Sequence, residues 1–274
     1  MPAVLILSSY VAVSRVGGGA QALALARLGV EPILIPTVLF GRHPGWGPPG
    51  GAPVEAAVMQ AMLEAVEAQG RFRELAAVIT GHFSTPEQVA VAARALDAVR
   101  AANPDAGLVV DPVMGDEGKG LYVSPAVADA LVAQLLPRAD LIAPNAWELE
   151  RLSGCKVTDP ASAAFAARIV RKPTLVSSVV DGGQLGVVYA DAAGAVAALH
   201  PRSDSAPNGT GDLLTALFTA GLALDLEPNA ALLCAASGVA EAVAAAGGLD
   251  ELPLQAFPSV LGVSQTVRVE LIGG

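Results

Sequence analysis

The chain has 274 residues, of which 53% are hydrophobic and 15% charged, a composition that supports a sizeable core and excludes an intrinsically disordered protein. A net charge of −10 without any Lys/Arg-rich run argues against binding to nucleic acid. The two cysteines, Cys155 and Cys234, are far apart and in no metal-binding spacing, so we expect neither a disulfide framework nor a zinc site, and a cytoplasmic location.

The first half of the chain alternates short apolar strands with helices. Its predicted strands cover residues 4–7, 32–38, 77–80 and 108–110, and its predicted helices cover 17–28, 54–68, 86–102 and 124–136. Residues 41–51 are too rich in Gly and Pro for a regular element, and a loop of this length is usually functional or disordered. The first strand has no basic segment before it, so we expect no signal peptide.

The second half continues the alternation and adds a hairpin. We predict strands at 141–143, 174–179, 185–189, 195–199 and 266–271, with helices at 146–152, 161–170, 210–224 and 229–246. The most apolar stretches, 213–224 and 230–240, are too short to span a bilayer, so we expect core helices and no membrane partner. This pattern predicts one α/β domain over residues 1–274, whose mostly parallel sheet is covered by helices on both faces.

Polar residues gather where the predicted strands end. They are Ser9, Thr37, Asp111, Asn145 and Glu148. Ligands of parallel sheets bind beyond the carboxyl ends of the strands. Carboxylates that converge there repel one another, and a hard cation such as Mg²⁺ would relieve the repulsion. Each of these residues taken singly is also explained as a strand-end turn or a helix cap.

The stretch Asn208-Gly209-Thr210-Gly211-Asp212 leads from a turn into an apolar helix. The backbone amides at the start of this helix favour an anion, and glycines let a ligand approach closely. An aspartate repels phosphate, but it could accept a proton from a hydroxyl that attacks one. The alternative is that Asp212 only caps the helix. This is not a Walker A loop, because no Gly-Lys-Ser/Thr follows the glycines.

These motifs carry a family resemblance. Residues 208–212 resemble the signature of the ribokinase-like superfamily, and DPVMGD at 111–116 and PNAWEL at 144–149 resemble its pyridoxal kinase branch. Ser9-Tyr10-Val11, residues 37–40 and His43 are also similar to that branch. The matches follow the family order from residue 9 to residue 221 and so cover most of the chain.

The resemblance implies a three-layer α/β/α sandwich and ATP-dependent phosphorylation of the 5′-hydroxyl of pyridoxal, and of pyridoxine and pyridoxamine. It makes Asp212 the base, and it gives Asp111 and Glu148 the Mg²⁺ site, with Glu148 acting through water. It also implies a homodimer and leaves a monovalent cation open. The phosphates are assigned to Gly209, Thr210, Gly211 and Asn145, and the pyridine ring to Ser9, Thr37, His43, Trp46, Gly81 and His82.

Several residues depart from the family pattern and leave the preferred vitamer open. Ser14 replaces a usual Gly, His82 a usual Tyr, and Ser177-Ser178 a Lys-His pair found in several relatives. The run Gly17-Gly18-Gly19-Ala20-Gln21 resembles the hydroxymethylpyrimidine kinases of thiamine synthesis, which are the nearest alternative. A non-catalytic vitamer-binding protein is a further alternative, against which the intact Asp212 argues.

Overall fold

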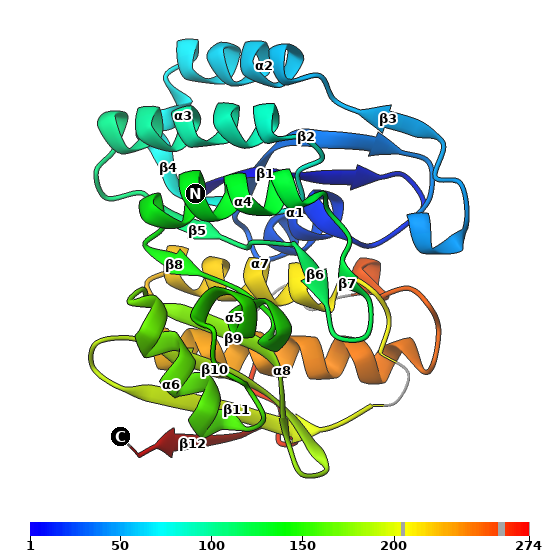
Figure 1. Cartoon of the computed structure of the whole chain (residues 1–274), viewed down its shortest axis with the longest axis vertical. Helices are drawn as coiled ribbons and strands as arrows, with labels where there is room; N and C mark the ends of the chain where they lie inside the picture. The colour runs from blue at the N-terminus through cyan, green and yellow to red at the C-terminus, as the bar shows by residue number, and fades with distance from the viewer. Residues whose placement is uncertain (204–205, 257–260, 274) are drawn as a thin grey trace.

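The chain forms a three-layer α/β/α sandwich around a central sheet (Figure 1). The computed structural model describes residues 1–203, 206–256 and 261–273. The sheet has ten strands in the order β12-β11-β10-β9-β8-β5-β4-β1-β2-β3, and a separate two-stranded hairpin joins β6 to β7. The predicted three-layer architecture is therefore confirmed.

The strands are β1 (Ala3–Val11), β2 (Glu31–Phe40), β3 (Gly51–Pro53), β4 (Leu75–Thr80), β5 (Gly107–Val110), β6 (Gly115–Asp116), β7 (Gly120–Leu121), β8 (Leu141–Ile142), β9 (Thr174–Asp181), β10 (Gln184–Ala190), β11 (Ala195–Pro201) and β12 (Arg268–Ile272). The α-helices are α1 (Gly17–Arg27), α2 (Ala56–Ala68), α3 (Pro86–Ala102), α4 (Pro125–Ala130), α5 (Ala146–Ser153), α6 (Pro160–Val170), α7 (Thr210–Ala223) and α8 (Pro228–Ala246).

The middle of the sheet is parallel and both of its margins are antiparallel. Strands β2, β1, β4, β5, β8 and β9 pair in parallel, whereas β3 and the run β10–β12 pair antiparallel with their neighbours. The outer strand β3 has three residues and includes Pro53, while the other outer strand, β12, carries Arg268 and Glu270. The predicted antiparallel strands late in the sheet are confirmed.

Side-chain alternation along the strands produces a core on each face of the sheet. In β1, Val4 and Ile6 pack with α1, α7 and α8, whereas Leu5 and Leu7 pack with α2, α3 and α4. This is the period of two that a strand buried on both faces requires. A third cluster joins α5 and α6 to β9–β11. Helices on both faces leave the carboxyl ends of the parallel strands open at one edge of the sheet.

Three local predictions differ from the structure. The predicted loop 41–51 contains a short 3₁₀ helix at Pro44–Trp46 and leads into β3, which extends the edge of the sheet. The helix predicted from residue 54 begins at Ala56, because the Val54 N–H bonds to the Thr37 carbonyl at 2.9 Å. The helix predicted over 124–136 stops at Ala130 and continues as a π turn and a 3₁₀ turn that contains Pro137.

Helix α8 is longer than the apolar stretch singled out in the sequence. Its 19 residues make it the one helix in the described part of the chain long and apolar enough to cross a membrane by length and composition. Its residues Ala231, Leu232, Ala235 and Ala236 are nevertheless buried in the same core as α7. A core helix passes the same test of length and composition. The prediction that this stretch is too short to span a bilayer is therefore wrong, whereas its predicted place in the core is confirmed.

Candidate active site

The site is built around the junction of α1 and α7. The N–H of Gly17, the first residue of α1, donates a hydrogen bond to Oδ2 of Asp212 at 2.8 Å, joining residues 195 positions apart in sequence. Gly17 has φ +59°, and a Cβ there would lie 2.0 Å from the Ser9 hydroxyl oxygen, so only glycine fits this turn. Burial raises the pKa of Asp212 to about 6, and the Gly17 N–H opposes part of that rise.

The start of α7 offers backbone N–H groups of the kind that bind anions. Gly209 is the N-cap residue with φ 90°, and no side chain caps this end of the helix. A Cβ on Gly209 would lie 2.1 Å from the Arg15 carbonyl oxygen, whereas a Cβ on Gly211 would have no atom within 4 Å. The bond from Leu213 N–H to Gly209 O closes the first turn, and the N–H groups that precede Leu213 in this turn have no acceptor within the helix, which is the arrangement that binds phosphate at helix N-termini.

Asp111 follows β5 and lies close to Asp212 and Glu148. Its Oδ2 accepts a bond of 3.1 Å from the hydroxyl of Thr215, which lies on α7. Asp111 is 7% exposed and Glu148 is 2% exposed. Burial first, and then the negative charges of Glu148 and Asp212, raise the pKa of Asp111 well above its usual range. Burial likewise raises the pKa of Glu148 to about 7. The three predicted carboxylates therefore form one electrostatic cluster.

Asn145 and Glu148 hold the β6–β7 hairpin beside this cluster. They form a capping box at the start of α5, with Glu148 N–H bonded to Asn145 Oδ1 at 2.8 Å and Asn145 N–H to Glu148 Oε2 at 3.0 Å. The other Glu148 oxygen accepts from Met114 N–H at 2.6 Å, and Asn145 Nδ2 donates to the Gly115 carbonyl at 2.8 Å. Both side chains therefore form hydrogen bonds to the backbone of residues 114–115, which follow Asp111 in the chain.

The cluster suits a hard cation through Asp111. The charges that act on the Asp111 pKa are negative, and its donor atoms are the oxygens that Mg²⁺ prefers. Both carboxylate oxygens of Glu148 accept hydrogen bonds from backbone N–H groups, so contact between Glu148 and a metal is favoured through a water molecule. Among residues 1–203, 206–256 and 261–273, no group of three His, Cys, Asp or Glu side chains is arranged as a metal cage. A metal would therefore depend on phosphate oxygens for further ligands.

Four of the predicted substrate residues line the neighbouring strand ends. Ser9 and Thr37 are buried, and the Thr37 hydroxyl donates to the His82 carbonyl oxygen at 2.6 Å. A Cβ on Gly81 would lie 2.4 Å from the Ser8 hydroxyl oxygen, so Gly81 permits close approach of β1. Burial lowers the pKa of His82, which keeps its ring neutral at pH 7, and in the described structure its buried Nδ1 has no hydrogen-bond partner.

His43 and Trp46 lie on the loop that follows β2. Their ring centroids are 6.0 Å apart in an edge-to-face arrangement, and His43 Nδ1 accepts from the Gly45 N–H at 3.1 Å. Burial and the charge of Lys119 lower the pKa of His43, while Glu251 opposes this. Lys119 belongs to the turn between β6 and β7, and in Figure 1 this hairpin and the loop both lie at the end of the sheet to which β1 and β2 point.

Comparison of the sequence with known proteins identifies the family to which the chain belongs. The model of the phosphomethylpyrimidine kinase family matches residues 19–253. The pyridoxine/pyridoxal/pyridoxamine kinase of Bordetella avium is 34% identical over 227 residues, covering 80% of this chain and 77% of that protein. The pyridoxal kinase PdxY of Deinococcus radiodurans is also 34% identical, over 229 residues, covering 78% of this chain and 77% of that protein. The chain belongs to the pyridoxal kinase family.

Solved pyridoxal kinases share the whole architecture. The enzyme from Leishmania donovani, solved in complex with ADP and pyridoxamine, is 26% identical, with a TM-score of 0.89 over 100% of both chains. The pyridoxal kinase of Entamoeba histolytica, at 23% identity, shows the same fold with a TM-score of 0.91, covering 99% of this chain and 100% of that chain. The ribokinase-like fold expected from the motifs is confirmed.

Two residues that contact the candidate carboxylates were not predicted from the sequence. The sequence places Gly17 at the start of a predicted helix, and Val16-Gly17 resembles the N-terminal substrate motifs of the family, but neither feature predicts that the Gly17 N–H holds Asp212. Thr215 was read as part of an apolar helix, although its hydroxyl binds Asp111. The signal for Thr215 was available, because a residue three positions after Asp212 lies on the same face of a helix. The signal for Gly17 was not, since its partner is distant in sequence.

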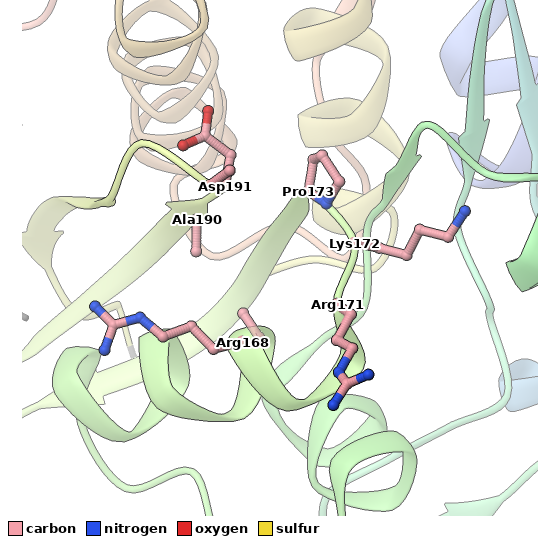
Figure 2. A pocket seen from close by; sticks show the side chains of 8 residues that line it. Arg168, Arg171, Lys172, Pro173, Ala190 and Asp191 are labelled. Carbon is pink, nitrogen blue, oxygen red and sulfur yellow. The ribbon is translucent and has the colours of Figure 1, made fainter.

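A separate pocket lies away from the pyridoxal kinase site. It occupies about 270 Å³ between the end of α6 and the start of β9, and its lining includes Arg168, Arg171, Lys172 and Asp191. Figure 2 shows the three basic side chains pointing in different directions, and Lys172 Nζ donates to the carbonyls of Pro137 and Ala139. Cations that diverge in this way do not form an anion site. The candidate site lies further along β9, where Ser177 in the middle of the strand forms an isolated bridge with Asn145.

Proposed function

We propose that this protein transfers the γ-phosphoryl group of ATP to the 5′-hydroxyl of pyridoxal, and of pyridoxine and pyridoxamine. The observation that carries the proposal is the placement of Asp212. Its carboxylate, held by the Gly17 N–H, lies in the first turn of a helix that, in the described structure, has no side-chain cap. A base and an anion-binding helix terminus at one point are what phosphoryl transfer to an alcohol requires.

Asp212 would accept the proton of the attacking hydroxyl. With a pKa of about 6, it is ionised at neutral pH and is a stronger base than an ordinary carboxylate. The hydrogen bond from Gly17 fixes one carboxylate oxygen and leaves the other for the substrate. The amides of Gly209, Thr210 and Gly211 would stabilise the charge that develops on the phosphoryl group.

We further propose Mg²⁺ as the cofactor. It would supply charge neutralisation between the nucleotide phosphates, and Asp111 would hold it, with Glu148 acting through water. The uncompensated negative cluster of Asp111, Glu148 and Asp212 supports this assignment. Chelation of the metal with EDTA is expected to abolish turnover, and added Mg²⁺ to restore it; turnover that persists in EDTA would refute the metal.

The activity is tested by mixing the purified protein with ATP, Mg²⁺ and pyridoxal and following the absorbance of pyridoxal 5′-phosphate. Hydroxymethylpyrimidine, with ATP consumption as the signal, is the matched alternative substrate, because the matching family model is described as phosphomethylpyrimidine kinase. Catalytic formation of pyridoxal 5′-phosphate supports the proposal. Turnover of the pyrimidine alone would move the chain to the other activity, and binding of pyridoxal without turnover of either would indicate a vitamer-binding protein.

The pH profile tests the base separately. We expect kcat/KM for pyridoxal to fall about tenfold for each pH unit below the pKa of Asp212, which is about 6, and to level off above it. The sign follows from the role, because the protonated carboxyl cannot accept the hydroxyl proton. A profile that stays flat between pH 5 and pH 8 would contradict the assignment of Asp212.

We also propose a cytoplasmic homodimer. Tyr10 and Leu39 are register partners on β1 and β2, and they are 42% and 51% exposed, with Val13 close by at 65%. Apolar side chains gathered beside one another are typical of a surface that another copy covers. Both cysteines are free, in keeping with a reducing compartment. Light scattering of the purified chain measures the oligomeric state directly.

A further inference from the structure

Gln88 in the first turn of α3 joins three segments that lie far apart in the sequence. It is fully buried, and its Oε1 accepts from the Ser84 N–H at 2.8 Å. Its Nε2 donates to the Thr37 carbonyl at 2.7 Å and to the Val54 carbonyl at 2.6 Å. The two donors of the amide and one lone pair of its oxygen are thereby used.

The local sequence explains only one of these bonds. Thr85 is the N-cap of α3 and its hydroxyl accepts from the Gln88 N–H, while the Gln88 oxygen bonds the N–H of Ser84, one residue before the N–H that the third-position Gln or Glu of a capping box would bind. That role needs only an acceptor, which a glutamate would supply equally well. The NH₂ group is instead committed to β2 and to the residue that follows β3, 51 and 34 positions away. The bond to Ser84 could be formed by a glutamate at position 88, but the two bonds that the side chain donates require the amide of glutamine.

The joined segments carry the residues predicted to contact the vitamer. Thr37 and His82 are predicted ring contacts, and the Thr37 hydroxyl already ties their two segments through the His82 carbonyl. The Thr37 carbonyl accepts from both Gln88 and the Val54 N–H, at 2.7 and 2.9 Å. Val54 directly follows β3, which is the returning stem of the loop that carries His43 and Trp46. One side chain thus sets the relative positions of these segments and of the loop stem.

We infer that Gln88 is a positioning residue for the vitamer, acting through Thr37, His82 and the stem of the 41–50 loop; this rests on the proposed pyridoxal kinase activity. It does not touch the nucleotide site, whose amides lie on α7. Losing its donors would leave the buried Thr37 carbonyl and the partly buried Val54 carbonyl with fewer partners and let these segments separate. A displacement of about 1 Å in a segment that contacts the substrate is enough to lower kcat/KM by about 10²-fold.

The test compares Gln88→Glu with Gln88→Met. Both variants remove the two donors, whereas only Gln88→Glu keeps the acceptor for the Ser84 N–H. We expect both to raise KM for pyridoxal about tenfold or more while KM for ATP stays within about twofold. The control is Gln60→Met on α2, where the amide bonds to Glu64 and Arg94 on the exposed surface, and where we expect no kinetic change.

A residue that only stabilises the fold would lower Tm and the active fraction but leave KM for pyridoxal unchanged at a temperature well below Tm. That result, or a wild-type KM in Gln88→Glu, would overturn the inference. A readout independent of turnover uses the two tryptophans of the chain. In a Trp147→Phe background Trp46 alone reports on the loop, and we expect acrylamide to quench its fluorescence more strongly after Gln88→Met; unchanged quenching would also count against the inference.

The two proposals fail in different ways. If the wild-type protein phosphorylates no vitamer, the proposed function is wrong, and the Trp46 quenching still measures whether Gln88 fixes the loop. If the wild-type protein is active and the Gln88 variants keep its KM for pyridoxal, the positioning role is wrong and the activity stands.

Discussion

Asp212→Asn is expected to lower kcat about 10²–10⁴-fold, because asparagine cannot accept the proton of the 5′-hydroxyl. The amide oxygen can still accept the Gly17 N–H bond of 2.8 Å, so the α1–α7 junction should survive. We therefore expect the KM values for pyridoxal and ATP to change by less than about threefold. Steady-state kinetics with both substrates measure the split, and near-full turnover would remove Asp212 from the mechanism.

The stability of the same variant provides a matched control. Because the pKa of Asp212 in the folded protein is raised to about 6 from 3.8, the native state binds this proton more readily than the unfolded chain does. Its ionised carboxylate thus costs folding free energy above pH 6, and the cost disappears as pH falls below about 4. We expect Asp212→Asn to be about 1–2 kcal/mol more stable at pH 8, allowing for partial exposure, and to match the wild type near pH 4.

Gly209→Ala is expected to reduce kcat/KM at least about 100-fold, because the new Cβ strikes backbone. Residue 209 has φ 90°, and the Cβ would lie 2.1 Å from the Arg15 carbonyl oxygen. The turn that carries Arg15 also leads to Gly17, which holds Asp212. Moving it would displace the phosphate amides and the base together. The left-handed conformation adds a further cost of about 1–2 kcal/mol in stability.

Gly211→Ala is the matched control within the same motif. A Cβ at this position meets no protein atom within 4 Å, and alanine stabilises a helix by about 0.5–1 kcal/mol relative to glycine. We expect this variant to fold at least as stably as the wild type and to show any loss as a higher KM for ATP, since its methyl group faces the space proposed for phosphate. Equal losses from the two substitutions would show that backbone strain at Gly209 is not the cause.

The parallel strands were predictable because each is a continuous apolar run, and β1 illustrates this with neighbouring residues buried on opposite faces. Asp111 and Asn145 were predictable as site candidates because polar residues after such strands share one edge of the sheet. Their position after the strands did not predict which hydrogen bonds Asn145 and Glu148 form. Their capping box and their bonds to residues 114 and 115 depend on a hairpin whose strands have two residues each.

The remaining features depend on contacts that no local pattern encodes. Strand β3, Gly51–Pro53, contains neither a β-branched nor an aromatic residue, so only its register against β2 makes it a strand. Gln88 fits a helix cap in sequence, and its long-range role appears only when β2 and the stem of the 41–50 loop are brought beside α3. The periodicity of a sequence indicates which face of one helix or strand is buried. The bonds of Gln88 form only where three segments pack together, and periodicity does not predict them.

The two outer strands of the sheet bear on how the protein behaves when crowded. An exposed strand edge offers unpaired N–H and C=O groups on which a second molecule can build. At one margin β3 covers β2 only from Val38 to Phe40, and Pro53 of β3 has no N–H to donate; the rest of β2 contains Pro32 and Pro36, which also lack an N–H. At the other margin Arg268 and Glu270 place charges along β12, which discourages an incoming strand. The residues at both margins therefore disfavour the addition of a strand from another molecule to this ten-stranded sheet, and with it the growth of fibres.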